Sequence, residues 1–154
     1  MDADQLLQSL GVALNVPDLR FDKNGCARLA IDGAPALDFE RGGPGILHVY
    51  SVLGQLPPEG REALYGDLLK GNLFGKETAG ASLAVDFLYG EVVLCRTVAT
   101  EHAVSHAFAA EMESFVAAAE EWKGRLEKSP GDAPSHQALA AFPAPQMMDH
   151  FLRG

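Results

Sequence analysis

Residues 46–53 read Ile-Leu-His-Val-Tyr-Ser-Val-Leu, a run rich in β-branched and aromatic side chains. Successive side chains of a strand point to opposite faces, and here apolar residues occupy both sets of alternating positions. Such a run is typical of a central strand that is covered on both faces. Glycines and a proline at residues 42–44 precede it, and Pro57 and Pro58 follow it. The stretch predicts the middle of a sheet with other elements packed on each side.

The chain before this strand predicts a meander of short antiparallel strands. Residues 27–31 and 37–40 alternate apolar with polar side chains, and an Asp-Gly pair between them turns the chain. Upstream, residues 19–22 lead into the Asn24-Gly25 pair, which supplies the positive φ angles of a tight hairpin. We therefore expect an additional short strand at 19–22, open at the edge of the sheet.

Three amphipathic helices accompany the strands. Leucines recur at helical spacing over residues 2–16, behind an aspartate suited to cap the helix. A shorter apolar stripe runs over residues 59–71. The longest pattern covers residues 101–127, where apolar residues repeat every three or four positions and Thr100 is the expected N-cap.

Residues 82–88 and 91–98 are β-rich runs joined through a Tyr-Gly pair, and they predict a closing hairpin. The order of elements is then α-β-β-β-α-β-β-α, with the additional strand at 19–22. This order predicts an α+β fold in which three helices accompany a twisted antiparallel sheet.

Composition excludes several classes of protein. Lys and Arg number 12 against 21 acidic residues, and the formal net charge of −9 repels polyphosphates, so we expect no nucleic-acid partner. The N-terminus is acidic where a signal peptide is basic, and no apolar run approaches the length of a membrane span. We expect a cytoplasmic protein without membrane insertion.

The composition changes after Lys128. We expect one folded domain at 1–128 and a mobile tail at 129–154, which holds four of the nine prolines. Within the tail, four apolar residues have the spacing of one amphipathic helical turn and offer a docked end as the alternative: Met147, Met148, Phe151 and Leu152.

Cysteines and histidines are the candidates for chemistry. Cys26 and Cys95 lie far apart in the sequence, and we expect free, buried thiols. His102 and His106 have the spacing of two metal ligands on one helix, but no third ligand accompanies them, so we favour neutral surface histidines. Cys26 with His48 is the alternative for a small cysteine hydrolase. We expect no catalysis, metal or cofactor.

Four short motifs occur in a fixed order along residues 2–127: Leu10-Gly11, Val49-Tyr-Ser-Val-Leu-Gly-Gln-Leu-Pro57, Leu68-Leu-Lys-Gly-Asn72 and Glu113-Ser-Phe115 to Glu120-Glu-Trp122. With the order of elements, they make the chain similar to the class I type III secretion chaperones, the Tir chaperone (CesT-like) family. Gly71 is a departure, because the family usually has alanine there.

The resemblance implies a homodimer that binds the N-terminal segment of a secreted effector protein in extended form and keeps it soluble and competent for secretion. It implies no catalysis and no cofactor. A regulatory protein of the same fold, which sequesters a regulator of secretion genes, is the alternative within the family.

Two sets of residues are the predicted contacts. Apolar side chains of the first helix and the meander are candidates for binding the partner: Leu10, Leu14, Leu19, Phe21, Leu29 and Phe39. Following the family, the second helix and the strand after it are the expected dimer interface: Leu64, Leu68, Leu83, Val85 and Phe87.

Overall fold

The computed structural model describes residues 1–128, and residues 129–154 lie outside the described part. The elements, in chain order with two 3-10 turns labelled η, are α1 (Ala3–Ala13), β1 (Cys26–Leu29), β2 (Leu37–Arg41), β3 (Ile46–Gln55), α2 (Arg61–Gly71), η1 (Leu73–Gly75), β4 (Ser82–Asp86), β5 (Glu91–Ala99), η2 (Thr100–His102) and α3 (Ser105–Glu127). The strands form one antiparallel sheet in the order β1-β2-β3-β5-β4. The predicted α+β fold with three helices is confirmed. The predicted tail falls on residues outside this description.

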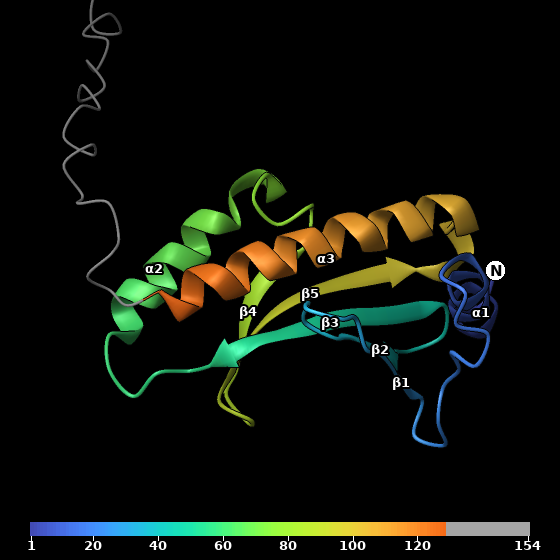
Figure 1. Cartoon of the computed structure of the whole chain (residues 1–154), viewed down its shortest axis with the longest axis horizontal. Coiled ribbons are helices and arrows are strands. Elements are labelled where there is room, and N and C mark those ends of the chain that lie inside the picture. Colours follow the sequence, from blue (N-terminus) through green and yellow to red (C-terminus); the bar gives the residue numbers. More distant parts are fainter. Residues whose placement is uncertain (129–154) are drawn as a thin grey trace, which may run out of the picture.

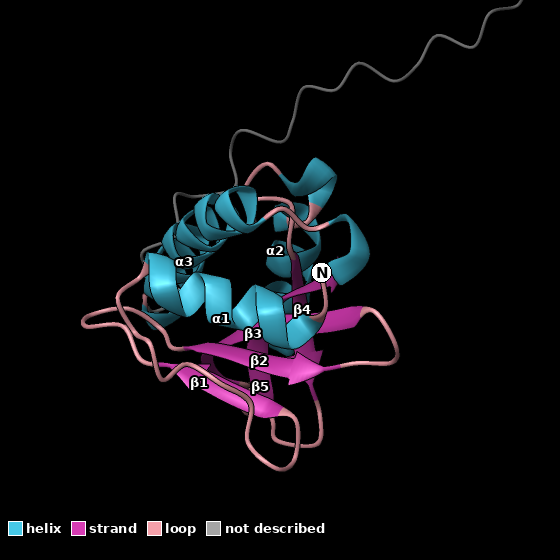
Figure 2. Cartoon of the chain, turned by 90° about the vertical axis from the view of Figure 1, so that its right-hand side faces the viewer, coloured by secondary structure: helices cyan, strands magenta, loops and turns pink. Residues whose placement is uncertain are grey.

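All three helices lie on one face of the sheet (Figure 1). α3 runs along the sheet, α1 packs near the N-terminal end of α3, and α2 lies near its C-terminal end (Figures 1 and 2). On β3 the side chains of Leu47, Val49 and Leu53 are at most 2% exposed, whereas His48 on the opposite face is exposed. The expectation that this strand is covered on both faces is wrong for residues 1–128 of the single chain, because none of their helices reaches the second face.

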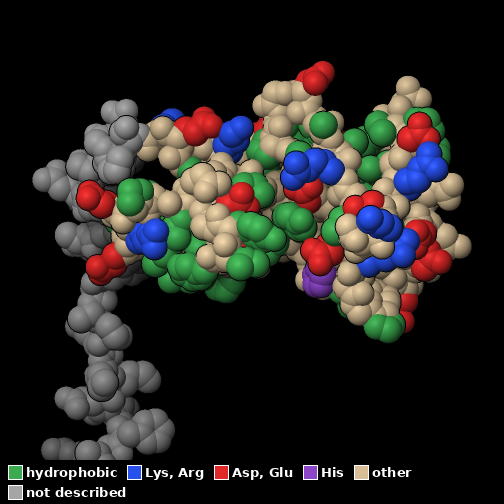
Figure 3. All heavy atoms as spheres, turned by 90° about the horizontal axis from the view of Figure 1, so that it is seen from below, with side chains coloured by type: hydrophobic (Ala, Val, Ile, Leu, Met, Phe, Trp, Pro, Cys, Tyr) green, Lys and Arg blue, Asp and Glu red, His purple; other side chains and the backbone are tan. Residues whose placement is uncertain are grey.

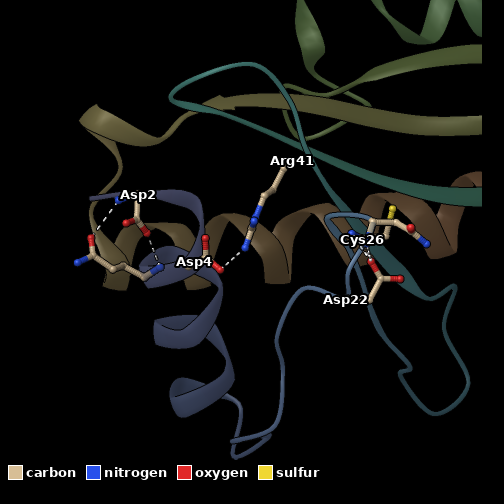
Figure 4. A network of polar contacts seen from close by, with 7 residues as sticks. Asp2, Asp4, Asp22, Cys26 and Arg41 are labelled. Carbon is tan, nitrogen blue, oxygen red and sulfur yellow. Dashed lines mark hydrogen bonds and ion pairs between the residues drawn. The ribbon is translucent and has the colours of Figure 1, made fainter.

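No strand forms at 19–22. The Asp22 carboxylate accepts hydrogen bonds from the backbone N–H groups of Asn24 (2.8 Å) and Cys26 (3.0 Å), and the Asp22 N–H donates to the Cys26 carbonyl (2.7 Å). Figure 4 shows this contact beside β1. These bonds close residues 22–26 into a local turn, because a short aspartate side chain competes with strand pairing for backbone donors.

The N-termini of the helices agree with the caps expected from the sequence only in part. Asp2 caps α1 in a reciprocal box with Gln5, as expected (Figure 4). Thr100 does not cap α3: it is 1% exposed, its N–H donates to the Gly45 carbonyl, and it begins the 3-10 turn η2, which ends before the helix. α3 therefore begins at Ser105 rather than at 101.

The core fills the space between the helices and the covered face of the sheet. Its largest fully buried side chains include Phe39 on β2 and Phe115 on α3, and Trp122 near the end of α3 is 3% exposed. The Trp122 indole N–H donates to the Glu77 carbonyl at 2.8 Å, which ties α3 to the loop before β4. Within residues 1–128, no helix is both long enough and apolar enough to cross a bilayer.

Candidate functional site: an apolar groove beside α3

A tight turn after α1 brings apolar side chains back toward α3. The Val16 N–H donates to the Gly11 carbonyl at 2.7 Å, and Asn15 adopts a left-handed conformation with φ 57°. A Cβ on Gly11 would approach the Val16 carbonyl oxygen to 2.6 Å, so only glycine permits this close return. The turn places Leu14 and Val16 at the surface beside the end of β1.

These residues form one side of a groove of about 400 Å³ between the end of α1, the β1–β2 region and α3. Its floor consists of Leu29, Leu37 and Met112, which are at most 6% exposed. Its walls keep more of their surface, and they comprise Leu14, Val16, Ala30, Ile31, Ala109, Val116 and Ala117.

Two carboxylates border this apolar surface. Glu113 and Glu120 on α3 both line the groove and are exposed. No ion pair involving either of them occurs among residues 1–128. An apolar groove with an acidic rim is suited to alternating or helically spaced apolar side chains of a peptide, with cationic groups at the rim.

The six predicted partner contacts are distributed over different environments. Leu14, 37% exposed, and Leu29 line the groove. Leu10, Leu19 and Phe39 are at most 6% exposed and belong to the core that supports it. Their direct contact with a partner stays a prediction, and their packing gives a partner little surface to touch.

Phe21 lies outside the groove lining. Its ring is half-buried, and the Arg41 guanidinium carbon stands 4.6 Å from the ring centroid, a cation–π contact. Arg41 in turn forms an ion pair with Asp4 on α1 (Figure 4). Phe21 therefore joins the loop before β1 to β2 and α1, in addition to any contact with a partner.

Sequence reasoning missed the α3 wall of the groove. Val116 and Ala117 stand beside the core stripe of α3, which includes Met112 and Phe115. The available signal was the width of the apolar face: α3 carries apolar residues at more positions than one core stripe needs, and the surplus faces the groove.

The five predicted dimer contacts are also distributed between core and surface. Leu68 and Leu83 are buried, Leu64 and Val85 are half-buried, and Phe87 is 71% exposed. Around them, large apolar side chains are unusually exposed in two groups: Leu69, Leu73 and Phe74 at the end of α2, and Phe87, Leu88 and Tyr89 at the β4–β5 turn. Figure 3, which views the molecule from below Figure 1, shows hydrophobic side chains gathered on this face near the middle of the molecule.

The cysteine–histidine pair does not assemble. Cys26 pairs with Glu40 across β1 and β2, and Glu40 pairs with His48, so an acidic residue separates the thiol from the imidazole. His48 Nδ1 instead lies 3.1 Å from the Thr97 hydroxyl. The pKa of the Cys26 thiol is raised by desolvation and by the carboxylates of Asp22, Glu40 and Asp38, which is the reverse of what a catalytic thiolate needs.

The remaining candidates for chemistry are equally separate. Both cysteines are free and half-buried rather than fully buried, and desolvation raises the pKa of Cys95 as well. His102 lies on η2 and His106 on α3, so the two are not on one helix, and His102 Nε2 lies 3.1 Å from the Glu101 carboxylate. No group of three metal-ligating side chains occurs in residues 1–128.

Comparison with known proteins defines the class. The model of the Tir chaperone protein (CesT) family matches residues 5–123, and the chain belongs to this family. A protein of Chlamydia pneumoniae is 28% identical over 125 residues, which cover 80% of this chain and 95% of that protein.

Solved structures agree on the fold. The HopA1–SchA chaperone–effector complex contains a chain with a TM-score of 0.63 and 21% identity, over 78% of this chain and 91% of that one. The heterodimeric ExoU–SpcU complex from the type III secretion system of Pseudomonas aeruginosa contains one with a TM-score of 0.63 and 22% identity, over 82% and 99%. The predicted resemblance to secretion chaperones is confirmed.

Proposed function

We propose that this protein is a cytoplasmic type III secretion chaperone that binds the N-terminal segment of a secreted effector in extended form, and that it catalyses no reaction. The observation that carries the proposal is the uncovered apolar groove beside α3, in a chain of the Tir chaperone protein family. The buried floor and the partly exposed walls leave apolar surface that a partner can remove from water.

The proposed contact uses apolar side chains in the groove and charge at its rim. Effector residues with apolar side chains pack on Leu14, Ile31 and Val116, while Glu113 and Glu120 favour cationic neighbours. Desolvated apolar contacts dominate affinity at such interfaces, and exposed rim charges mainly alter association rate and salt dependence.

The test begins with the chain in its native host. Co-purification and mass spectrometry identify the bound protein, and its N-terminal segment is then titrated by calorimetry against the wild type and two variants. Val116→Glu places a carboxylate on the groove wall and is expected to weaken binding at least about tenfold. Ala110→Glu adds the same charge to an exposed position of the same helix outside the groove and is expected to change affinity less than about twofold.

Equal affinity of wild type and Val116→Glu, with both proteins folded by circular dichroism, would place the partner elsewhere. A partner that is a regulator of secretion genes, rather than a secreted protein, would favour the regulatory alternative of the same fold.

We also propose that the protein is a homodimer through α2 and β4. β4 is an edge strand paired only with β5 in the described chain, and Leu69, Leu73 and Phe74 at the end of α2 are 61–84% exposed. Exposed apolar groups of this size mark interaction surfaces on soluble proteins. Sedimentation at micromolar concentration is expected to give twice the chain mass of 16.4 kDa; a stable species at the chain mass contradicts the dimer.

A further inference from the structure

The groove leaves a substantial apolar surface open in the isolated chain. Leu14 is 37% exposed, and Val16, Ile31 and Val116 are half-buried around a buried floor. An apolar concavity of about 400 Å³ has room for a few large side chains. Covering it removes apolar surface from water, so any nearby apolar segment of the same chain competes for it.

The chain carries one segment with matching chemistry. Residues 147–152 read Met-Met-Asp-His-Phe-Leu, and Arg153 follows them. In a helical turn each methionine has Phe151 or Leu152 as a neighbour, because residues three or four positions apart lie close together on a helix. Methionine adapts its shape to irregular apolar surfaces, which suits a shallow groove.

Charge distinguishes this segment from the other apolar stretch of the tail. Residues 138–142 read Ala-Leu-Ala-Ala-Phe and carry no charge. Residues 147–152 contain Asp149 and His150 and are followed by Arg153, whereas the groove rim has the two exposed carboxylates Glu113 and Glu120. In the docked segment Arg153 lies at one end, where contact with a rim carboxylate is favourable, while Asp149 has to face away from the rim.

The chain is long enough to reach the groove. α3 ends at Glu127, and the rise of about 1.5 Å per residue puts Val116 roughly 17 Å back along the helix. Residues 129–146 supply a connection of 18 residues, whose maximum reach of about 60 Å exceeds this distance. The connection therefore lets residues 147–152 reach the groove, and tethering over such a length gives an effective concentration on the order of millimolar.

We propose that residues 147–152 of this chain dock in the groove beside α3 when no partner occupies it. The tail then acts as an internal competitor, which covers the apolar surface and is displaced by an effector segment. A single turn binds weakly, so at millimolar effective concentration it lowers the affinity for a partner by a factor of about two to five. Docking itself is independent of the proposed function, whereas the competition depends on it.

The test uses the full chain without any partner. Methyl groups of Leu14, Ile31, Val116 and Ala117 are observed by NMR, with the exposed Leu88 at the β4–β5 turn as a distant reference. Phe151→Ser is expected to shift the groove methyls and leave Leu88 unchanged. Phe142→Ser is the matched control, because it removes the same ring from the same tail outside the docking segment, and it is expected to shift none of them.

Groove methyls that are identical in the wild type and Phe151→Ser, or that respond equally to Phe142→Ser, overturn the proposal. Shifts that grow with protein concentration also overturn it, since they indicate docking between separate molecules. In a second arm, Phe151→Ser is expected to bind the effector segment about two- to fivefold more tightly than wild type. If the expected methyl shifts occur but the protein binds no effector segment, the docking of the tail is supported and the proposed function is refuted.

Discussion

Gly71→Ala is expected to destabilise the protein, although alanine is the better helix former. Gly71 is the last residue of α2 and is buried. A Cβ at this position would stand 2.2 and 2.5 Å from two ring carbons of Trp122 and 2.9 Å from a methyl of Leu83. Carbon atoms pack best at about 3.5–4.0 Å, so either the ring or the helix has to move.

Neither neighbour moves easily. The Trp122 ring donates its N–H to the Glu77 carbonyl at 2.8 Å, and the Arg125 guanidinium lies 4.4 Å from the ring centroid. The end of α2 is tied to β4, because the Asn72 side chain donates to the Leu83 carbonyl at 3.1 Å and accepts from its N–H at 2.7 Å. The added methyl therefore overpacks a site that is closed on both sides.

The magnitude follows from two opposing effects. Overpacking of a core costs about 1–3 kcal/mol, while the gain in helix propensity is at most about 1 kcal/mol and is smaller at a helix end. We expect a net loss of about 1–2 kcal/mol in the free energy of unfolding, and a fall in melting temperature of about 3–8 °C. Thermal and urea denaturation followed by circular dichroism at one protein concentration measure it.

Gly66→Ala is the matched control on the same helix. Its added Cβ meets nothing within 4 Å, so only the propensity gain remains, and we expect stabilisation by about 0.5–1 kcal/mol. Trp122→Phe removes the part of the ring that the new methyl meets, and Gly71→Ala is expected to cost less than about 0.5 kcal/mol in that background. Equal stabilisation by both glycine substitutions would refute the packing of Trp122 on α2.

Three further predictions concern other parts of the chain. Arg28→Leu removes the two hydrogen bonds, of 2.6 and 2.9 Å, that the Asp38 carboxylate accepts from Arg28, and the Asp38 side chain is only 9% exposed. This change is expected to lower the free energy of unfolding, measured by urea titration, by about 1–2 kcal/mol. The same change at the exposed Arg20 is expected to cost less than about 0.5 kcal/mol, and equal costs would contradict the burial of Asp38. Cys26 is expected to react with iodoacetamide at pH 7.5 more slowly than free cysteine, because its raised pKa lowers the thiolate fraction, and the reaction is expected to become faster as the pH rises. Rapid alkylation at neutral pH would support the hydrolase alternative instead. Phe21 lies outside the groove lining, and as a partner contact beyond the groove its change to alanine is expected to leave the protein folded by circular dichroism and to weaken effector binding by about 2 kcal/mol in calorimetry. Unchanged binding would confine the partner to other surfaces, and unfolding would assign Phe21 to the core.

Interactions between neighbouring residues explain which secondary-structure elements the sequence predicted correctly and which it did not. The Asp2 cap, the alternating strands of the meander and the β4–β5 hairpin depend on neighbouring residues, and the structure has all of them. The prediction of a strand at 19–22 was wrong because the Asp22 side chain accepts hydrogen bonds from nearby backbone N–H groups and closes a turn, which uses donors that hairpin pairing would need.

The sequence by itself determined the order of elements, the acidic charge and the family, because periodicity, turn residues and composition act over short stretches of chain. Only the tertiary structure decided which apolar residues are core and which are surface. Leu10 and Leu14 belong to the same amphipathic pattern, yet Leu10 is 1% and Leu14 37% exposed, because α1 ends at Ala13 and Leu14 lies in the turn that follows it. The groove likewise combines residues from the turn after α1, from β1, β2 and the loop between them, and from α3, and its existence depends on how these segments pack rather than on any one of them.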